Sequence, residues 1–177
     1  MQINYQLLSP TQVKLDLLEP FNRYQDVKQC WRKENNDWIL KDIAFIEQWD
    51  QTDKQQLVQG LQHTIQTNGV VFGAFNHHQL TGFTSVESEL FGSKQQYRVL
   101  TNLYVSYEMR AKGIGRKLFY LAADWAKQNG AKKLYISAHS SKETQAFYHA
   151  IGCIQAQELH PYWIEHEPYD CQLEFLL

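Results

Sequence analysis

LYVSYEMRAKGIGRKL, residues 103–118, is the stretch around which the chain is organised. It is typical of a strand end, a short loop and the first turn of a helix. A helix N-terminus leaves its first N–H groups unpaired and carries a partial positive charge, so it favours an anion such as phosphate. Gly113 and Gly115 lack a Cβ atom and let an anion approach the backbone. Four basic side chains add positive charge to this predicted anion site: Arg110, Lys112, Arg116 and Lys117.

The length and composition are those of a single globular domain. The chain has 177 residues, of which 44% are hydrophobic and 20% charged, and it holds five Trp, ten Tyr and nine Phe. A chain of this length buries a sizeable core but is short for two domains, and its aromatic content argues against disorder. A net charge of −2 argues against a nucleic-acid binder, which would present a broad basic face.

Three widely spaced cysteines, Cys30, Cys153 and Cys171, form no Cys-x-x-Cys pair. Separated thiols in odd number are typical of a reducing compartment. Residues 1–16 show neither the basic nor the apolar region of a signal peptide, and no apolar run approaches the ~20 residues that cross a bilayer. We therefore expect a cytoplasmic protein that does not associate with membranes.

Hydrophobic periodicity and turn residues divide the chain into strands and helices. Strands are expected at 3–8, 70–75, 80–87, 97–105, 133–138, 153–158 and 171–177, and a loop at 160–168. Helices are expected from residue 11 onward, from the capping box Thr52–Gln55 to residue 68, at 116–129, and from the capping box Ser140–Glu143 to residue 151. This order predicts an α/β fold with a single mixed, mostly antiparallel central sheet flanked by helices.

Two other segments affect the expected organisation. Residues 23–49 mix charges with tryptophans and fit no single period. They could cover a pocket or form a second layer of core, and the second interpretation is favoured. His77 and His78 fall in a turn without a nearby carboxylate or cysteine, so no metal site is expected. We expect one domain over 1–177, with a largely helical, substrate-side part at 1–69 and a core at 70–158.

Three kinds of phosphate-binding loop can be compared with the glycine stretch. A P-loop needs Gly-x-x-x-x-Gly-Lys-Ser/Thr, and Gly113 and Gly115 are too close together for that pattern. A dinucleotide-binding fold needs Gly-x-Gly-x-x-Gly, but Leu118 stands at the third glycine position. The pattern that remains is Arg-x-x-Gly-x-Gly opening a helix after a strand, from Arg110 to Gly115.

This pattern resembles the acetyl-CoA loop of the GCN5-related N-acetyltransferase (GNAT) superfamily, which reads Gln/Arg-x-x-Gly-x-Gly/Ala after a strand end similar to residues 103–105. The likeness continues through the helix 116–129, the strand 133–138 and the segment AFYHAIGC at 146–153. That segment is similar to the family's Phe-Tyr-x-x-x-Gly-Phe, with Cys153 in place of the last Phe. The resemblance covers about residues 70–158.

The resemblance implies a set of contacts to acetyl-CoA. Residues 110–115 would cradle the pyrophosphate, and a β-bulge near Leu103 and Val105 would let strand N–H and C=O groups pair with the pantetheine arm. An N–H group there would also hold the thioester oxygen as negative charge develops on it. The residues implied as acetyl-CoA contacts are Leu103, Tyr104, Val105, Arg110, Ala111, Lys112, Gly113, Ile114, Gly115, Arg116, Ser141 and Tyr148.

The implied chemistry is direct attack of an amine on the acetyl thioester. Tyr148 matches the family tyrosine that donates a proton to the leaving thiolate, since a phenol with pKa near ~10 stays protonated at pH 7. The base that takes the proton of the attacking ammonium is left open. Many relatives carry Glu two residues before the Leu103 position, where this chain has Thr101. The candidates are Glu87, Glu89, His139 and a chain of waters.

The acceptor and the partners are less defined. The acidic C-terminal part holds Glu158, Glu165, Glu167, Asp170 and Glu174, which would suit an amine-bearing small molecule or a basic peptide. Because Thr101 replaces the usual Glu, a non-catalytic acyl-CoA-binding regulatory module is the alternative function, and a nucleotide-binding regulator is a third. Relatives often form homodimers, and the apolar last strand could pair within or between chains.

Overall fold

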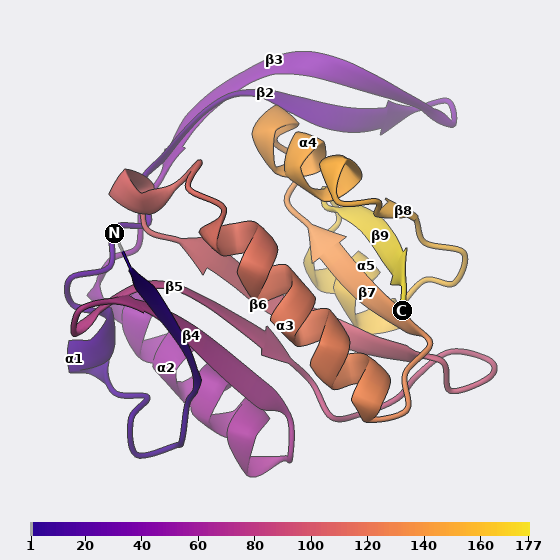
Figure 1. The fold of residues 1–177 in the computed structure, drawn as a ribbon. Coiled ribbons are helices and arrows are strands. Elements are labelled where there is room, and N and C mark those ends of the chain that lie inside the picture. Colours follow the sequence, from indigo (N-terminus) through magenta and orange to yellow (C-terminus); the bar gives the residue numbers. More distant parts are fainter. Residues whose placement is uncertain (1) are drawn as a thin grey trace.

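The computed structural model describes residues 2–177, in which strands alternate with helices (Figure 1). The strands are β1 (Ile3–Leu7), β2 (Gln25–Glu34), β3 (Asp37–Glu47), β4 (Val70–Asn76), β5 (Gln79–Val86), β6 (Tyr97–Val105), β7 (Lys133–Ala138), β8 (Ile154–Gln155) and β9 (Cys171–Leu176). The helices are α1 (Leu15–Leu18), α2 (Gln51–Gln66), α3 (Ile114–Gln128), α4 (Lys142–Ala150) and α5 (Pro161–His166), with a 3-10 turn at Tyr107–Met109. Within residues 2–177, no helix is long and apolar enough to span a membrane.

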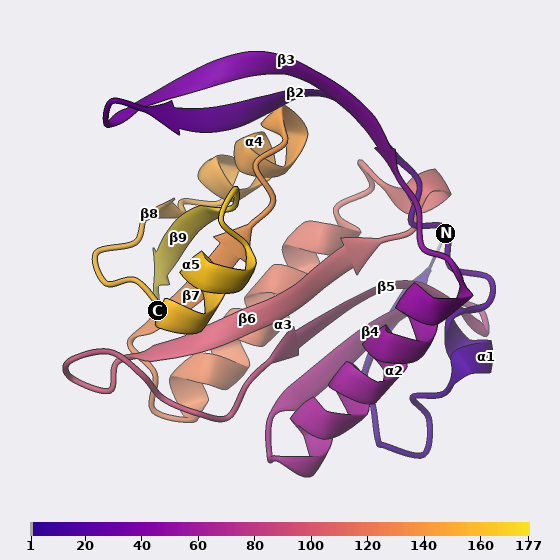
Figure 2. The ribbon, with the colours of Figure 1, turned by 180° about the vertical axis from the view of Figure 1, so that it is seen from behind.

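Seven of the strands form one sheet in the order β1-β4-β5-β6-β7-β9-β8. Neighbouring strands run antiparallel except β6 and β7, which are parallel. Helices α3 and α4 cover one face, and α2 and α5 lie on the other (Figures 1 and 2). The predicted mixed, mostly antiparallel sheet flanked by helices is therefore confirmed.

Helix α3 packs its apolar stripe against the middle of the sheet. Leu118, Phe119, Ala122 and Ala126 recur at helical spacing and are fully buried, which stabilises the fold by roughly 1.5–3 kcal/mol for each large side chain. The helix stops at Gly130, whose φ of 93° is the left-handed conformation that ends many helices. The position of α3 in turn fixes the loop that precedes it.

Strands β6 and β7 pair only near their N-terminal ends, where Tyr97–Val99 face Lys133–Tyr135. Beyond that point β6 stays with β5 and β7 stays with β9, so the two strands separate. The register of β5 with β6 also shifts at Thr101, which is the bulge expected near Leu103. This irregularity increases the local twist and helps the strands to diverge.

The separation leaves one edge of β6 without a strand partner. The Asn102 carbonyl faces β5, where it accepts a hydrogen bond from Thr84 Oγ1 at 2.8 Å. Because N–H and C=O groups alternate in direction along a strand, the backbone groups of Leu103 and Val105 point the other way, toward the gap. These groups are available to a ligand that lies along β6.

Residues 25–47 correct the expectation of a largely helical N-terminal part and of a second core layer. They form a long two-stranded hairpin, β2–β3, that passes above α4 (Figure 1). Asn35 and Asn36 have φ of 49° and 72°, as in tight hairpin turns. Few of the hairpin's side chains are buried, Val27 and Cys30 among them, and a register shift beside Val27 breaks the two-residue alternation. The sequence pattern therefore did not reveal the strands.

Several predicted boundaries differ in detail. Helix α2 is capped by Asp50, which forms a capping box with Asp53, and α4 is capped by Ser141, whose hydroxyl accepts from Thr144 N; both caps differ from the predicted Thr52 and Ser140 boxes. The expected 160–168 loop contains the short helix α5, and the expected 153–158 strand shrinks to β8. The last strand, β9, lies inside the sheet between β7 and β8.

Candidate active site

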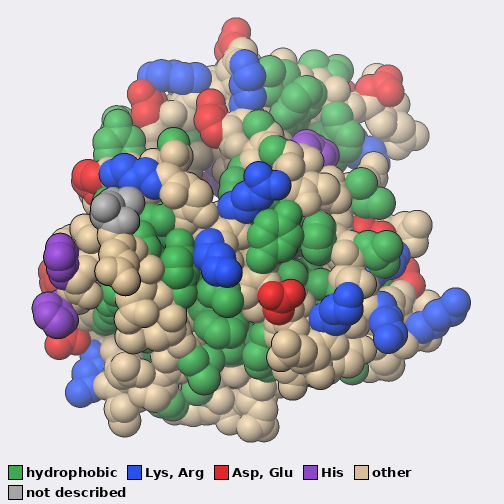
Figure 3. Space-filling model, in the orientation of Figure 1, with side chains coloured by type: hydrophobic (Ala, Val, Ile, Leu, Met, Phe, Trp, Pro, Cys, Tyr) green, Lys and Arg blue, Asp and Glu red, His purple; other side chains and the backbone are tan. Residues whose placement is uncertain are grey.

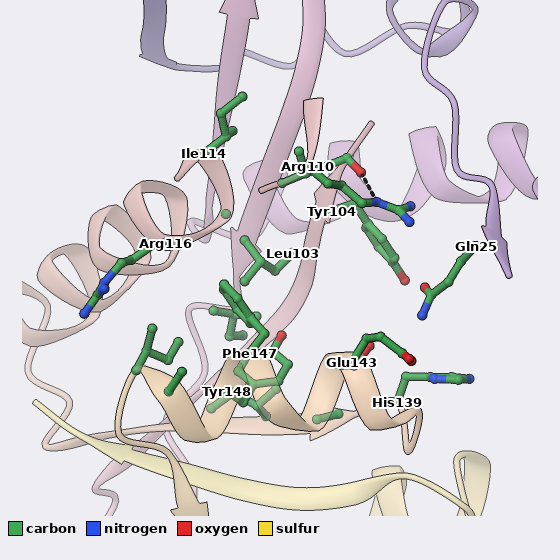
Figure 4. A pocket seen from close by; sticks show the side chains of 18 of the residues that line it. Gln25, Leu103, Tyr104, Arg110, Ile114, Arg116, His139, Glu143, Phe147 and Tyr148 are labelled. Carbon is green, nitrogen blue, oxygen red and sulfur yellow. Dashed lines mark hydrogen bonds between the residues drawn. The ribbon is translucent and has the colours of Figure 1, made fainter. Parts of the chain in front are cut away.

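A cleft of about 900 Å³ opens where β6 and β7 separate. Its walls come from β6, the loop before α3, the first turn of α3, α4 and the end of β7, and the hairpin adds Gln25 and Glu47 (Figure 4). Eleven of the residues proposed from the sequence line this cleft: Leu103, Tyr104, Val105, Arg110, Ala111, Gly113, Ile114, Gly115, Arg116, His139 and Tyr148. The fold thus brings together two motifs that lie about thirty residues apart.

The glycine loop takes a conformation that side chains rarely adopt. Ala111 and Gly113 have φ of 58° and 80°, and Gly113 is the N-cap of α3. Positive φ at every second residue turns successive backbone N–H groups toward one concave side of the loop, as in anion-binding nests. A Cβ on Gly115 would lie 3.4 Å from Val105 and 3.5 Å from Phe147, in ordinary van der Waals contact with both, so Gly115 stands where β6 and α4 come closest to the start of α3.

Basic side chains surround this end of α3 although the chain is slightly acidic overall. Figure 3 shows Lys and Arg side chains over the N-terminal end of α3. Lys112 does not line the cleft, because its Nζ donates to the Glu108 carbonyl at 2.6 Å. Arg110 turns into the cleft and donates from Nε to the Val105 carbonyl at 3.1 Å (Figure 4).

Tyr148 lies on α4 and points its hydroxyl into the cleft (Figure 4). Its ring is buried against Phe119 and Phe147. Burial raises the pKa of the phenol above its ordinary value, because the phenolate would lose its hydration. Tyr148 therefore stays protonated at neutral pH and can donate a proton or a hydrogen bond.

His139 has both ring nitrogens engaged. Nδ1 accepts a hydrogen bond from the Ser141 N–H at 3.1 Å, and Nε2 lies 3.1 Å from Glu47 Oε1. The hydrogen bond from His139 and the charge of Arg23 lower the pKa of Glu47. This arrangement assigns the ring proton to Nε2, and it leaves no free lone pair on His139 for an incoming proton.

The structure places the other candidate bases outside the cleft. Glu87 lies behind Thr101, where its carboxylate accepts from Thr64 Oγ1 at 2.7 Å and from Thr101 Oγ1 at 3.2 Å. Thr101 itself lines the cleft. Glu89 is exposed on the loop after β5. Neither carboxylate borders the space that a substrate would fill.

Ser141 does not line the cleft either. It is fully buried, and its hydroxyl accepts from Gln25 Nε2 at 3.2 Å and donates to Thr144 Oγ1 at 2.8 Å. Next to it, the Ser140 carbonyl accepts from Trp31 N at 2.8 Å. Ser141 therefore belongs to the contact that fastens the hairpin to α4.

Five further residues line the cleft at the end opposite the glycine loop, and the sequence indicated two of them only as part of an acidic set. The hairpin region contributes Arg23, Gln25 and Glu47, and the segment before β9 contributes Glu167 and Asp170. The last two belong to the acidic C-terminal set. The others in that set lie elsewhere: Glu158 accepts from Ser93, Glu165 is exposed, and Glu174 is buried beside Lys133. The only sequence feature that pointed to Glu167 and Asp170 was the acidic composition of residues 158–174, and no motif pointed to Arg23, Gln25 or Glu47.

A model of the GNAT family of acetyltransferases matches residues 22–153. The chain therefore belongs to the GNAT acetyltransferase family. This agrees with the separated strands β6 and β7, the glycine loop that opens α3 and the tyrosine on α4. Comparison with curated protein sequences finds no match.

Solved structures with the same fold cover nearly the whole chain. A protein from Bacillus anthracis, provisionally named a streptothricin acetyltransferase and solved with acetyl coenzyme A, aligns at TM-score 0.73 and 13% identity over 100% of this chain and 99% of its own. Nourseothricin acetyltransferase aligns at TM-score 0.69 and 15% identity, over 98% of this chain and 96% of its own. The PaiA N-acetyltransferase of Thermoplasma acidophilum, solved with coenzyme A, aligns at TM-score 0.61 and 14% identity, over 100% of both chains.

Potential metal ligands are not concentrated anywhere in the described part of the chain. Across residues 2–177, no group of three or more His, Cys, Asp or Glu side chains is arranged to hold a metal ion. His77 and His78 lie in the β4–β5 turn. The cysteine thiols are free and buried, and burial raises the pKa of Cys153 and of Cys171 to about 12, which keeps them protonated.

Proposed function

We propose that the protein transfers the acetyl group of acetyl-CoA to a primary amine of a small molecule or peptide. The observation that carries this proposal is the open edge of β6 leading directly to the glycine loop. A strand edge accepts an extended amide-containing chain such as pantetheine, and the loop with the first turn of α3 favours a pyrophosphate. The solved relatives named above with acetyl coenzyme A or coenzyme A support this reading.

Residues 110–116 would hold the pyrophosphate through backbone N–H groups and basic side chains. The backbone of Leu103 and Val105 would pair with the pantetheine amides. An N–H group of β6 in the gap would also donate a hydrogen bond to the thioester oxygen as it becomes negative in the transition state. The Val105 carbonyl accepts a hydrogen bond from Arg110. The Arg110 side chain would therefore move away when this carbonyl pairs with pantetheine.

Tyr148 would supply the proton that the departing thiolate requires. Its burial keeps the phenol protonated, and its hydroxyl faces the cleft between α4 and β6 (Figure 4). Among residues 2–177 no side chain or backbone group forms a hydrogen bond with this hydroxyl. The donor is therefore free to bond to sulfur.

The first experiment measures acetyl-CoA binding by calorimetry and then thiol release with a panel of acceptors. The panel contains 1,5-diaminopentane, spermidine, benzylamine and glutamate, which differ in charge around the amine. We expect binding in the micromolar range, typical of such substrates, and thiol release with at least one amine. Mass spectrometry would show the acceptor heavier by one acetyl group.

The other outcomes identify the alternatives. If acetyl-CoA binds but no amine in the panel causes release of the CoA thiol, an acyl-CoA-binding regulatory module is favoured. This outcome would agree with Thr101 standing where many relatives carry Glu. Failure to bind acetyl-CoA, with binding of a nucleotide such as ATP, would contradict the proposal and favour a nucleotide-binding regulator.

A further inference from the structure

Asp170 borders the cleft at the end opposite the glycine loop. It follows α5 in the chain and immediately precedes β9, the strand that pairs with β7. The residue is half-buried. Asp170, Tyr104 and Tyr148 line the same cleft, and the Asp170 charge adds to burial in raising the pKa of both phenols.

Asp170 differs from the other buried acid of the cleft in how its charge is compensated. Glu47 pairs with Arg23 and with His139. Within residues 2–177, Asp170 forms no ion pair with a lysine, arginine or histidine. Its one side-chain hydrogen bond comes from Ser137 Oγ, at 3.2 Å to Oδ2. The carboxylate therefore keeps lone pairs free toward the cleft.

A chain of polar groups holds the carboxyl in place. Gln172 Nε2 donates to Ser137 Oγ at 3.0 Å, and Tyr135 donates its hydroxyl proton to Gln172 Oε1. With its lone pair occupied by Gln172, the Ser137 hydroxyl directs its proton to Asp170. These contacts come from two neighbouring strands, β7 and β9, so the position of Asp170 is set by the sheet.

The electrostatic surroundings keep Asp170 poised to take up a proton. Burial, together with the negative charges of Glu167 and Glu47, raises the pKa of the Asp170 carboxyl to about 6. The hydrogen bond from Ser137 acts in the opposite direction. A carboxylate with this pKa is ionised at pH 7.5 but is a stronger base than an exposed aspartate.

We propose that Asp170 is the general base that removes the proton from the acceptor's ammonium group. The inference rests on the proposed N-acetyl transfer. Asp170 takes one ammonium proton, and the neutral amine attacks the thioester carbonyl carbon. The C–N bond forms and the C–S bond breaks. The thiolate takes a proton from Tyr148, the phenolate regains one from the new amide nitrogen, and Asp170 returns its proton to water.

The geometry favours Asp170 over the bases suggested by sequence alone. His139 has both nitrogens engaged, and the Glu87 carboxylate bonds to Thr64 and Thr101 outside the cleft. Asp170 combines a free lone pair with a place on the cleft wall. Among residues 2–177, Glu143 and Glu167 also line the cleft without an ion pair, but both are exposed to solvent, whereas Asp170 is half-buried and held by Ser137.

The test uses the whole protein with acetyl-CoA and 1,5-diaminopentane, followed by thiol release from pH 5 to 9. Wild type should lose kcat/KM as the pH falls below about 6. Asp170→Asn should lower kcat by about 10²-fold or more and remove this acid limb, while acetyl-CoA affinity measured by calorimetry stays unchanged. Ser137→Ala, a change in a positioning residue, should move the limb to higher pH. Glu165→Gln, on the exposed side of α5, is the matched control and should behave as wild type.

A second measurement does not depend on turnover. Carbon-13 NMR of side-chain carboxyls, compared between wild type and Asp170→Asn, would assign the Asp170 titration, expected near pH 6. A midpoint near 4 would overturn the inference. Equal kcat and pH profile in Asp170→Asn would overturn it while leaving N-acetyl transfer in place. Wild type that binds acetyl-CoA but acetylates no amine in the panel would overturn both proposals.

Discussion

At the scale of single residues, burial sets the protonation of two groups that line the cleft, Tyr148 and Asp170. Burial raises the pKa of both Tyr148 and Asp170, but the consequences differ because their ordinary pKa values differ. Tyr148 moves further from neutrality and stays a donor. Asp170 moves toward neutrality and becomes an effective acceptor. Burial can thus provide both a proton donor and a proton acceptor within one cleft.

Replacing Tyr148 with Phe should lower kcat by about 10²-fold and leave the acetyl-CoA Kd within about twofold. The substitution removes only the hydroxyl, so the packing against Phe119 and Phe147 is kept. Steady-state kinetics and calorimetry would measure the two effects. Tyr120→Phe is the control, because Tyr120 lies on α3 and does not line the cleft. Unchanged turnover in Tyr148→Phe would contradict the assigned role.

Replacing Asp170 with Asn should stabilise the protein above pH 6. The folded-state pKa of about 6 exceeds the ordinary value of 3.8, so ionisation of Asp170 destabilises the fold, and stability is lost as the pH rises from 3.8 through 6. After discounting for partial exposure, Asn should add about 1–2 kcal/mol at pH 8, or ~2–8 °C in Tm. Thermal unfolding at pH 8 and pH 4 would measure this. A Tm gain that persists at pH 4 would contradict the argument.

At the scale of elements, the cleft depends on the junction of β6 with α3 and on the hairpin β2–β3. The loop between β6 and α3 presents N–H groups because Ala111 and Gly113 adopt positive φ. The hairpin is held over α4 by two hydrogen bonds to Ser140. Trp31 N donates to its carbonyl at 2.8 Å, and Arg32 Nη1 donates to its hydroxyl at 2.7 Å. The hairpin is therefore held in place by hydrogen bonds, although few of its side chains are buried in the hydrophobic core.

The glycines on either side of α3 allow a matched test of the glycine loop at residues 110–115. Gly113 and Gly130 flank the helix, both have positive φ, and a Cβ on either would meet no atom within 4 Å. Ala at either site should cost a similar ~1 kcal/mol in stability. We expect only Gly113→Ala to weaken acetyl-CoA binding, by about tenfold, because relaxing its φ turns the loop N–H groups away. Calorimetry on both variants would decide, and equal affinities would contradict a role for the loop.

At the scale of the whole molecule, one sheet supports cores on both of its faces. Phe119 and Ala122 of α3 join one cluster, and Leu61 of α2 and Phe83 of β5 join the other. The strands between these clusters are shared, so neither core can lose its packing without exposing the other. We propose that residues 1–177 unfold as one domain.

A single cooperative transition should therefore appear in thermal and urea unfolding. Trp31 of the hairpin, Trp49 before α2 and Trp125 of α3 would report different regions by fluorescence, and circular dichroism would report the sheet and helices. The two probes should give the same midpoint. Separate midpoints would contradict a single domain and would indicate that the hairpin opens before the sheet. Light scattering on the same samples would show whether the protein forms a homodimer.

Much of the fold could be predicted because its signals are local. Residues 133–138 form a strand as predicted, and the helix after the glycine loop is displaced by two residues at its start. These elements carry clear periodicity and glycine stops. The hairpin was missed because its faces are both largely exposed and its register shifts, so it shows no alternation. At the site, the loop could be found from its glycines, whereas Asp170 carries no motif.

The sequence by itself determined the donor half of the cleft. The glycine loop with its basic residues and the tyrosine segment are each contiguous in the chain, and local backbone preferences act on contiguous residues. Only the tertiary structure decided which acid lies at the other end. Glu47, His139 and Asp170 come from three separate segments, and pairing of β7 with β9 and folding of the hairpin over α4 place them together. Whether a carboxylate is paired, exposed or buried depends on those neighbours, and within residues 2–177 half-burial on the cleft wall without an ion pair is what singles out Asp170.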